Sequence, residues 1–217
     1  MHSFKLRKRE VDIKAKIIAG AGELFTRYGV RSISMDDIAR QLSISKKTIY
    51  QYFKDKDQVV TRAVQAYMEL EKTEYDEIFH SSHDAVEELT KICSCMRKDF
   101  HEMNPSLLFD LKKFHPAAWE VWLEFKNDHI KNSVVNNLKK GIEEGYFRKD
   151  IDPEFLAILR VEQVQLIFNN HIFPTDQFNL KETQIKLFDH YVYGIVTDKG
   201  RKLYEQYLED ELLKSKQ

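Results

Sequence analysis

The stretch SMDDIARQLSISKKTIYQYF, residues 34–53, decides how the rest of the chain is interpreted. Ser34 and Asp37 have the Ser-x-x-Asp spacing of a capping box, which predicts that a helix begins here. One buried helix face follows at the i, i+3, i+4, i+7 spacing, formed by Met35, Ile38, Ala39 and Leu42. Residues 43–45 interrupt this spacing and predict a short turn.

A second short helix is predicted directly after the turn. Ser45 is placed to cap it, and its apolar face consists of Ile49, Tyr50 and Phe53. Its first turn exposes Lys46, Lys47 and Thr48. A short helix, a tight turn and a helix with a cationic N-terminus are the layout of a helix-turn-helix motif, whose second helix enters the major groove of DNA.

Composition and charge agree with this interpretation. The chain has 217 residues, enough for one or two domains, and its 4 Pro and 7 Gly leave too few turns for an all-β fold. Residues 1–56 hold 13 Lys and Arg against 6 Asp and Glu, a balance of +7, whereas the remaining residues balance at −8. A basic N-terminal quarter on an acidic body is typical of a small module that binds a polyanion.

Several function classes find no support in the sequence. No stretch has the length of a membrane span and no apolar signal core follows the N-terminus, so we expect a cytoplasmic protein without membrane contact. Cys93 and Cys95 point to different sides of a helix, which disfavours a disulfide or a metal site. There is no P-loop, dinucleotide-binding turn or nucleophile elbow, so we expect no enzyme activity, no catalytic residues and no cofactor.

The remaining sequence predicts helices throughout. Residues 1–10 form a basic arm that either reaches DNA or is a solvated tail, and residues 11–28 form the first helix, which ends at Gly29. Beyond residue 53 a long helix begins at Asp55 or Asp57. Further helices are expected over residues 84–102, 116–144, 153–172, 181–197 and 199–213.

Residues 11–56 resemble the N-terminal DNA-binding domain of the TetR family of bacterial transcriptional regulators. The resemblance rests on Ala21, Leu24, Phe25, Tyr28, Gly29, Asp37-Ile38-Ala39, Ser45-Lys46, Thr48-Ile49-Tyr50, Tyr52-Phe53 and Lys56. One departure is Ser43, which stands where the family usually has glycine in the turn. Residues 141–153 are also similar to a recurrent stretch in the C-terminal domain of this family.

This resemblance implies an all-α protein of nine or ten helices. Residues 1–56 would be the DNA-binding domain, and residues 57–217 a helical ligand-binding and dimerisation domain. It further implies a homodimer that binds a near-palindromic operator in double-stranded DNA. A small-molecule effector in the C-terminal domain would relieve repression by changing the separation of the two DNA-binding domains.

The residues expected at the DNA follow from the motif and the resemblance. Base edges are within reach of the first turn of the recognition helix and of Gln51, whose amide has the groups to read adenine. Ser34, Tyr52 and Lys56 match family positions that usually contact phosphates. The full set is Ser34, Ser45, Lys46, Lys47, Thr48, Tyr50, Gln51, Tyr52 and Lys56.

Two further sites are expected in the body. An aromatic-rich set lines either a ligand pocket or a plain hydrophobic core, and consists of Met96, Phe100, Phe109, Phe114, Trp119, Trp122 and Phe125. The helix over residues 153–172 is apolar on more than one face and therefore needs a second partner surface. The expected dimer interface pairs it with residues 181–197, through Leu159, Val164, Leu166, Ile167, Phe188, Tyr191, Val192 and Ile195.

Two alternatives stay open beside a repressor controlled by a small molecule. The first is a helical enzyme whose basic arm binds a phosphorylated substrate, although no motif supports it. The second is a DNA-binding regulator that a protein partner controls, without a small-molecule pocket. A cavity in the body would distinguish the small-molecule repressor from this second alternative.

Overall fold

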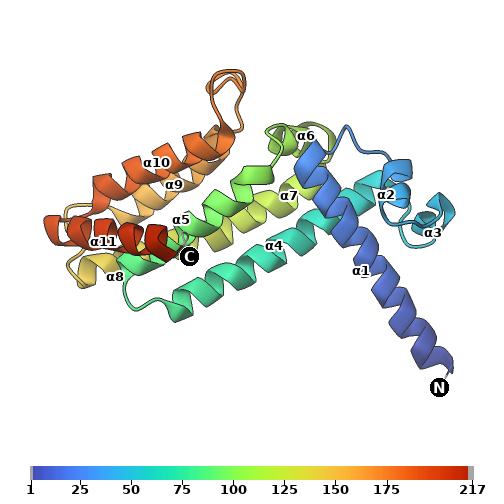
Figure 1. The fold of residues 1–217 in the computed structure, drawn as a ribbon, viewed down its shortest axis with the longest axis horizontal. Helices are drawn as coiled ribbons and strands as arrows, with labels where there is room; N and C mark the ends of the chain where they lie inside the picture. Colours follow the sequence, from blue (N-terminus) through green and yellow to red (C-terminus); the bar gives the residue numbers. More distant parts are fainter. Residues whose placement is uncertain (1, 215–217) are drawn as a thin grey trace. The chain divides into compact units, whose positions relative to one another are not determined.

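The computed structural model describes residues 2–214, without the side chains of residues 2–12, 99, 101–102 and 211–214. The described chain is helical, and its one strand-type pairing is an isolated antiparallel bridge between Phe147 and Val196. The helices are α1 (His2–Tyr28), α2 (Met35–Gln41), α3 (Lys46–Tyr50), α4 (Lys56–Ser81), α5 (Ala85–Glu102), α6 (Leu107–Phe114), α7 (Pro116–Glu124), η1 (Phe125–Ile130), α8 (Lys131–Glu143), α9 (Pro153–Leu166), α10 (Leu180–Ile195) and α11 (Asp198–Lys214) (Figure 1).

The predicted fold class is confirmed. Helix α7, the π-helical turn η1 and helix α8 follow one another without a break, so the described chain contains ten continuous helices. The backbone of residues 2–10 belongs to α1. The side chains of the basic arm lie outside the described residues, so its DNA contacts stay a prediction.

Local signals set several helix ends as expected. Gly29 follows α1 with a φ of 80°, and its N–H donates to the carbonyl of Phe25 at 2.9 Å. Helix α9 begins with Pro153 at its first position, and the carboxylate of Asp152 caps its first turn. Helix α9 ends at Leu166, earlier than the expected residue 172, and residues 167–179 form a connection to α10.

The chain forms two compact units. The head unit comprises Met1–Glu71 and Glu102–Leu123, and the body unit comprises Lys72–His101 and Glu124–Gln217. The head unit therefore contains α6 and α7 in addition to the helix-turn-helix motif. The functional division at residue 56 stays a prediction.

Within the head unit, residues 102–123 bind the N-terminal helices by polar contacts. The N–H of Asn104 donates to the carbonyl of Thr26 at 2.7 Å. The buried carboxylate of Asp110 accepts from the N–H of Arg31 at 3.2 Å. These bonds satisfy backbone groups at the end of α1 and in the loop that follows it.

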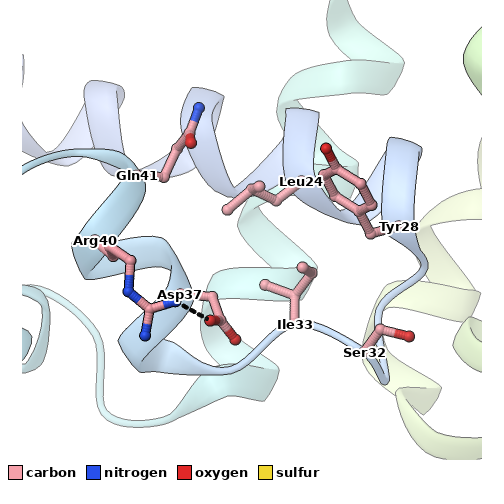
Figure 2. Close-up of a pocket in the computed structure, with 7 residues that line it drawn as sticks. All are labelled: Leu24, Tyr28, Ser32, Ile33, Asp37, Arg40 and Gln41. Atoms are coloured by element: carbon pink, nitrogen blue, oxygen red, sulfur yellow. Dashed lines mark hydrogen bonds and ion pairs between the residues drawn. The ribbon is translucent and has the colours of Figure 1, made fainter.

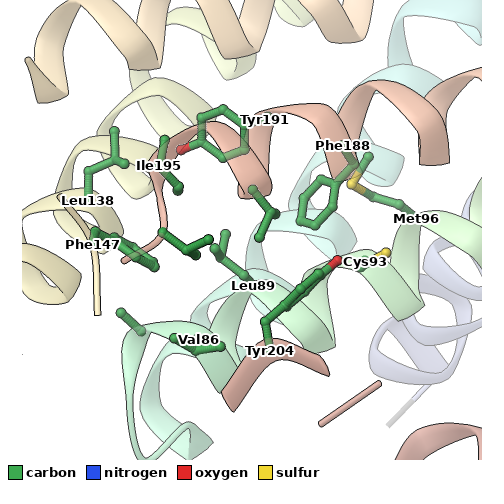
Figure 3. Packing of buried hydrophobic residues seen from close by; sticks show 13 residues of the cluster. Val86, Leu89, Cys93, Met96, Leu138, Phe147, Phe188, Tyr191, Ile195 and Tyr204 are labelled. Carbon is green, nitrogen blue, oxygen red and sulfur yellow. The ribbon is translucent and has the colours of Figure 1, made fainter. Parts of the chain in front are cut away.

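The body unit has a hydrophobic core between α5, α8, α10 and α11 (Figure 3). Its members include Val86, Leu89, Cys93 and Met96 from α5, Leu138 from α8, Phe188, Tyr191, Val192 and Ile195 from α10, and Tyr204 from α11. The bridge residue Phe147 packs in the same core. Helix α9 packs on α8 and buries Ala157, Arg160 and Val161.

This core corrects part of the expected dimer interface. The sequence predicts four α10 side chains at that interface, and the structure places them in the core of their own chain: Phe188, Tyr191, Val192 and Ile195. Ile167 is buried as well. Their apolar face is used by α5 and α11, which leaves none of it for a second copy. Leu159 on α9 is exposed.

Close packing at Gly141 provides a test of the body core. A Cβ at this position of α8 would lie 2.1 Å from the Phe147 ring, whereas a Cβ at Gly194 of α10 would meet nothing within 4 Å. We expect Gly141→Ala to lower the free energy of unfolding by about 1–3 kcal/mol, because a buried aromatic ring must move. The matched change Gly194→Ala should raise it by roughly 0.4–1 kcal/mol. Urea unfolding followed by circular dichroism measures the stability of both variants, and equal effects would contradict the close packing of Gly141 against the Phe147 ring.

Candidate nucleic-acid interface

The first helix of the motif is fixed by a reciprocal cap. Ser34 Oγ accepts from the N–H of Asp37 at 3.2 Å, and the N–H of Ser34 donates to Asp37 Oδ2 at 2.9 Å. Ser34 Oγ also donates to the same carboxylate, at 2.6 Å. These bonds to Ser34 lower the pKa of the Asp37 carboxyl. The predicted capping box is therefore present, and it sets where α2 begins.

The turn between α2 and α3 uses a left-handed backbone conformation. Ser43 has a φ of 54°, a region that glycine adopts without a steric cost. The N–H of Ile44 then donates to the carbonyl of Ala39 at 3.0 Å and closes the turn. The turn keeps this conformation although Ser43 replaces the glycine that the family usually has here.

Helix α3 is short and is held at both ends. Ser45 Oγ accepts from the N–H of Thr48 at 3.0 Å and lies 2.8 Å from Thr48 Oγ1. Ile49 and, just beyond the helix, Phe53 are buried in the head unit. The cap and these two apolar anchors fix the rotation of α3 about its axis.

The opposite face of α3 is exposed. Lys47 and Gln51 are exposed, and the described residues give the Lys47 ammonium no hydrogen-bond or ion-pair partner. Tyr50 is also exposed, although the sequence placed it on the apolar face of this helix with Ile49 and Phe53. A cation, an amide and a phenol on one exposed face are groups that donate to base edges and phosphates.

Two predicted DNA contacts already have partners within the chain. Lys46 Nζ lies 2.8 Å from Asp36 Oδ2, and this bond raises the pKa of the Lys46 ammonium. The pair is exposed, so a phosphate can replace the carboxylate at little cost. Lys56 Nζ donates to the carbonyl of Val30 at 2.6 Å, and partial burial lowers its pKa. Lys56 therefore supports the loop after α1, and its contact with a phosphate stays a prediction.

An open hollow of about 480 Å³ lies on the head unit between α1 and α2. It is lined by Leu24, Tyr28, Ser32, Ile33, Asp37, Arg40 and Gln41 (Figure 2). Arg40 Nη1 pairs with Asp37 Oδ1 at 3.1 Å, and the Arg40 side chain is largely exposed. Arg40 has no distinguishing signal in the sequence, because no spacing rule separates a DNA-facing arginine on α2 from a solvated one.

The expected ligand-pocket residues are divided between the two compact units. Phe109, Phe114, Trp119 and Trp122 belong to the head unit, and Met96, Phe100 and Phe125 to the body unit. Phe109 and Phe114 are exposed, and Arg31 and Lys113 lie over the Phe114 ring. The single pocket lined by all seven residues stays a prediction.

Other kinds of site find no support in the described part of the chain. Its His, Cys, Asp and Glu side chains form no group of three or more that could hold a metal ion. None of its helices combines the length and the apolar character needed to cross a membrane.

Comparison with known proteins identifies the motif. Residues 17–63 match the family described as bacterial regulatory proteins, tetR family. The chain belongs to the TetR family. Members of this family bind operator DNA and function as dimers.

The similarity to curated relatives extends beyond the matched segment. YvaF of Bacillus subtilis strain 168, an HTH-type transcriptional regulator, is 24% identical over 184 residues, which cover 84% of this chain and 95% of YvaF. KstR2 of Mycobacterium tuberculosis strain H37Rv, an HTH-type transcriptional repressor, is 22% identical over 146 residues, which cover 66% of this chain and 73% of KstR2. This TetR-family chain is therefore a DNA-binding transcriptional regulator.

Solved structures share the fold at low sequence identity. The ketosteroid transcriptional regulator KstR2 of Mycobacterium tuberculosis matches with a TM-score of 0.58 and 18% identity, over 85% of this chain and 95% of that one. A transcriptional regulator from Saccharomonospora viridis in complex with choline matches with a TM-score of 0.71 and 19% identity, over 86% of this chain and 99% of that one.

The backbone of the turn provides a test of the motif. Ser43→Gly should keep the free energy of unfolding or raise it by up to about 1 kcal/mol, because glycine tolerates a positive φ. Ser43→Val should lower it by about 1–2 kcal/mol, because a β-branched side chain clashes there. Urea unfolding measures both variants, and a valine variant as stable as the parent would contradict the turn geometry.

Proposed function

We propose that this TetR-family protein is a ligand-responsive repressor, a homodimer that binds a near-palindromic operator and leaves it when a small molecule binds the body unit. The observation that carries the proposal is the capped helix α3, whose inner side is anchored by Ile49 while its outer side exposes Lys47 and Gln51. A recognition helix needs this combination of fixed rotation and free donors.

The proposed dimeric state is supported by the outer face of α9. Phe155, Ile158 and Leu159 are 63%, 51% and 44% exposed, at the i, i+3, i+4 spacing of one helix face. An apolar face of this kind favours burial against a second copy of the same helix. We therefore propose that the dimer interface contains these three side chains and the half-buried Leu166, which follows Leu159 by seven residues on the same face. Val164, also half-buried, follows the buried Arg160 and Val161 at i+4 and i+3, so it lies toward the opposite side of α9.

A response to a small molecule is supported by the relatives. The Saccharomonospora viridis structure contains choline, and KstR2 is named a ketosteroid transcriptional regulator. Control by a protein partner remains the alternative, and no feature of the described residues favours it.

The second segment of the head unit offers a route for control. Residues 102–123 hold the N-terminal helices through Thr26, Arg31 and Asp57, the last of which lies 2.7 Å from His115 Nδ1. Helix α7 in this segment continues through η1 into α8 of the body unit. His115 directly precedes α7, so a ligand that displaced the α7–α8 helix would act first on the contact between His115 and Asp57 of α4.

The recognition helix can be tested with DNA selected from a genomic library. Lys47→Ala should weaken binding to the selected fragment by roughly tenfold and reduce the slope of log K against log salt by about one, because one phosphate cation is lost. Lys149→Ala is the control, since it removes an exposed lysine from the body unit. Fluorescence anisotropy at several salt concentrations measures the DNA affinity of both variants. Equal losses of affinity in the two variants would contradict the assignment of α3 as the recognition helix.

The interface can be tested by placing a charge on α9. Ile158→Asp should convert the dimer to a monomer, because a carboxylate would be buried without a partner between two copies. Ile172→Asp is the matched control, since Ile172 is similarly exposed, at 48%, but lies in the connection after α9. Light scattering after gel filtration gives the mass of each variant. A dimer that persists in Ile158→Asp would remove α9 from the interface.

A further inference from the structure

The core of the body unit contains a guanidinium without a carboxylate. Arg160 on α9 is 4% exposed, and the described residues provide it with no ion pair. Lys126, the other buried Lys or Arg side chain of the described chain, is paired with Glu162 at 2.7 Å. Buried charges are normally paired, because an isolated ion loses its hydration without compensation.

The partners that Arg160 does have are weak ones. Its Nη2 lies 3.6 Å from the sulfur of Met96, and its Cζ lies 5.0 Å from the centre of the Phe188 ring and 5.6 Å from that of Tyr191. Its Nη1 is enclosed and has no hydrogen-bond partner within the described chain. Aromatic faces and a thioether attract a cation, but they do not accept from a guanidinium fork as an oxyanion does.

Two side chains of α10 also bury a polar atom without a hydrogen-bond partner in the described chain. The Tyr191 hydroxyl and Gln184 Oε1 are enclosed without a hydrogen-bond partner among the described residues. Gln184 Nε2 lies 4.0 Å from the same Met96 sulfur that Arg160 contacts, and Figure 3 shows Met96 beside Phe188. Burial raises the pKa of Tyr191 and lowers that of Arg160. Arg160 of α9 and Gln184 of α10 therefore contact the same sulfur atom, and the Tyr191 ring lies beside the Arg160 guanidinium.

The side of Arg160 toward α4 and η1 is polar as well. Tyr75 is near enough to influence Arg160 electrostatically, and its ring meets the His129 ring at 6.1 Å. His129 lies on the π-helical turn, and its Nε2 is enclosed without a partner in the described chain. Single π-helical turns occur frequently at functional sites. Several unsatisfied polar groups within one apolar core are typical of a ligand site.

We propose that the body unit binds a small organic carboxylate, whose head accepts from Arg160 and from the Tyr191 hydroxyl and whose apolar part lies among Met96, Phe100 and Phe188. This inference rests on the proposed ligand-responsive function and specifies its ligand. Phe100 packs on the same core and meets Phe168 at 6.0 Å, which extends the apolar surface beyond Met96.

The charge of the site selects a carboxylate over a phosphate. Arg160 supplies one positive charge, and Lys126 is already neutralised by Glu162. A monoanion balances this charge, whereas a phosphate dianion would bring one uncompensated charge into the core. The planar guanidinium also matches the two oxygens of a carboxylate. The competing explanation is a structural cation held only by the Phe188 and Tyr191 rings.

The test compares carboxylates with their neutral counterparts on the full-length protein without DNA. The probes are hexanoate, decanoate, tetradecanoate, benzoate and phenylacetate, each beside its primary amide. Thermal unfolding finds the acids that bind, and calorimetric titration gives their dissociation constants. The variants are Arg160→Met and Tyr191→Phe, and Arg148→Met is the control because it removes an exposed arginine from the same unit.

We expect at least one carboxylate to raise the unfolding temperature of the parent in a saturable way, while its amide does not. Arg160→Met should weaken that binding roughly a hundredfold, as expected when one partner of a buried charge pair is removed. Tyr191→Phe should weaken it roughly tenfold, and Arg148→Met should leave it unchanged.

Three results would overturn the proposal: no probe acid shifts the unfolding temperature, the amides shift it equally, or Arg160→Met binds the acid as the parent does. If Arg160→Met does not fold, an unchanged affinity in Tyr191→Phe overturns it instead. Since no DNA is present, these failures leave operator binding untouched. A protein that binds carboxylates but selects no genomic fragment would refute the repressor and keep the site.

Discussion

The burial of Ile49 and Phe53 is the constraint on which DNA recognition depends. Helix α3 has five residues, far fewer than an isolated helix needs to persist in water. Its cap at Ser45 satisfies the first turn, but only the two apolar anchors determine which side faces outward. The position of Lys47 is therefore a consequence of packing in the head unit, and any change in that packing moves the reading face.

Residues 102–123 contribute to the same packing of the head unit. They are distant in sequence from the helix-turn-helix motif. Even so, the N–H of Asn104 donates to a carbonyl near the end of α1, and the carboxylate of Asp110 accepts from an N–H of the loop that follows α1. Because a buried backbone group without a partner is costly, the loop follows this segment when it shifts. The head unit is thus held together by two segments that lie before and after α5 in the sequence, so contacts outside the motif help to determine its packing.

The features predicted correctly from sequence are those that short spacing determines. The Ser34 and Ser45 caps, the helix start at Pro153 and the all-α class depend on residues within about one turn of each other. The use of each apolar face depends on distant residues instead. Helix α10 shows this, since its apolar face is covered by α5 and α11 rather than by a second copy. Arg160 carried no sequence signal, because the pattern shows an arginine within an apolar helix but not what surrounds it.

Helix α9 connects the two sites proposed for the body unit. Helical geometry points Ile158 and Leu159 outward while the next residue, Arg160, points into the core. A core built only for stability would place an apolar side chain at this position, because an unpaired buried charge is destabilising. The proposed carboxylate would satisfy that charge from inside, and the proposed second copy would cover the outer face of the same helix. Both then bias the position of one element, so ligand and dimer geometry must be coupled, and the coupling must be equal in both directions.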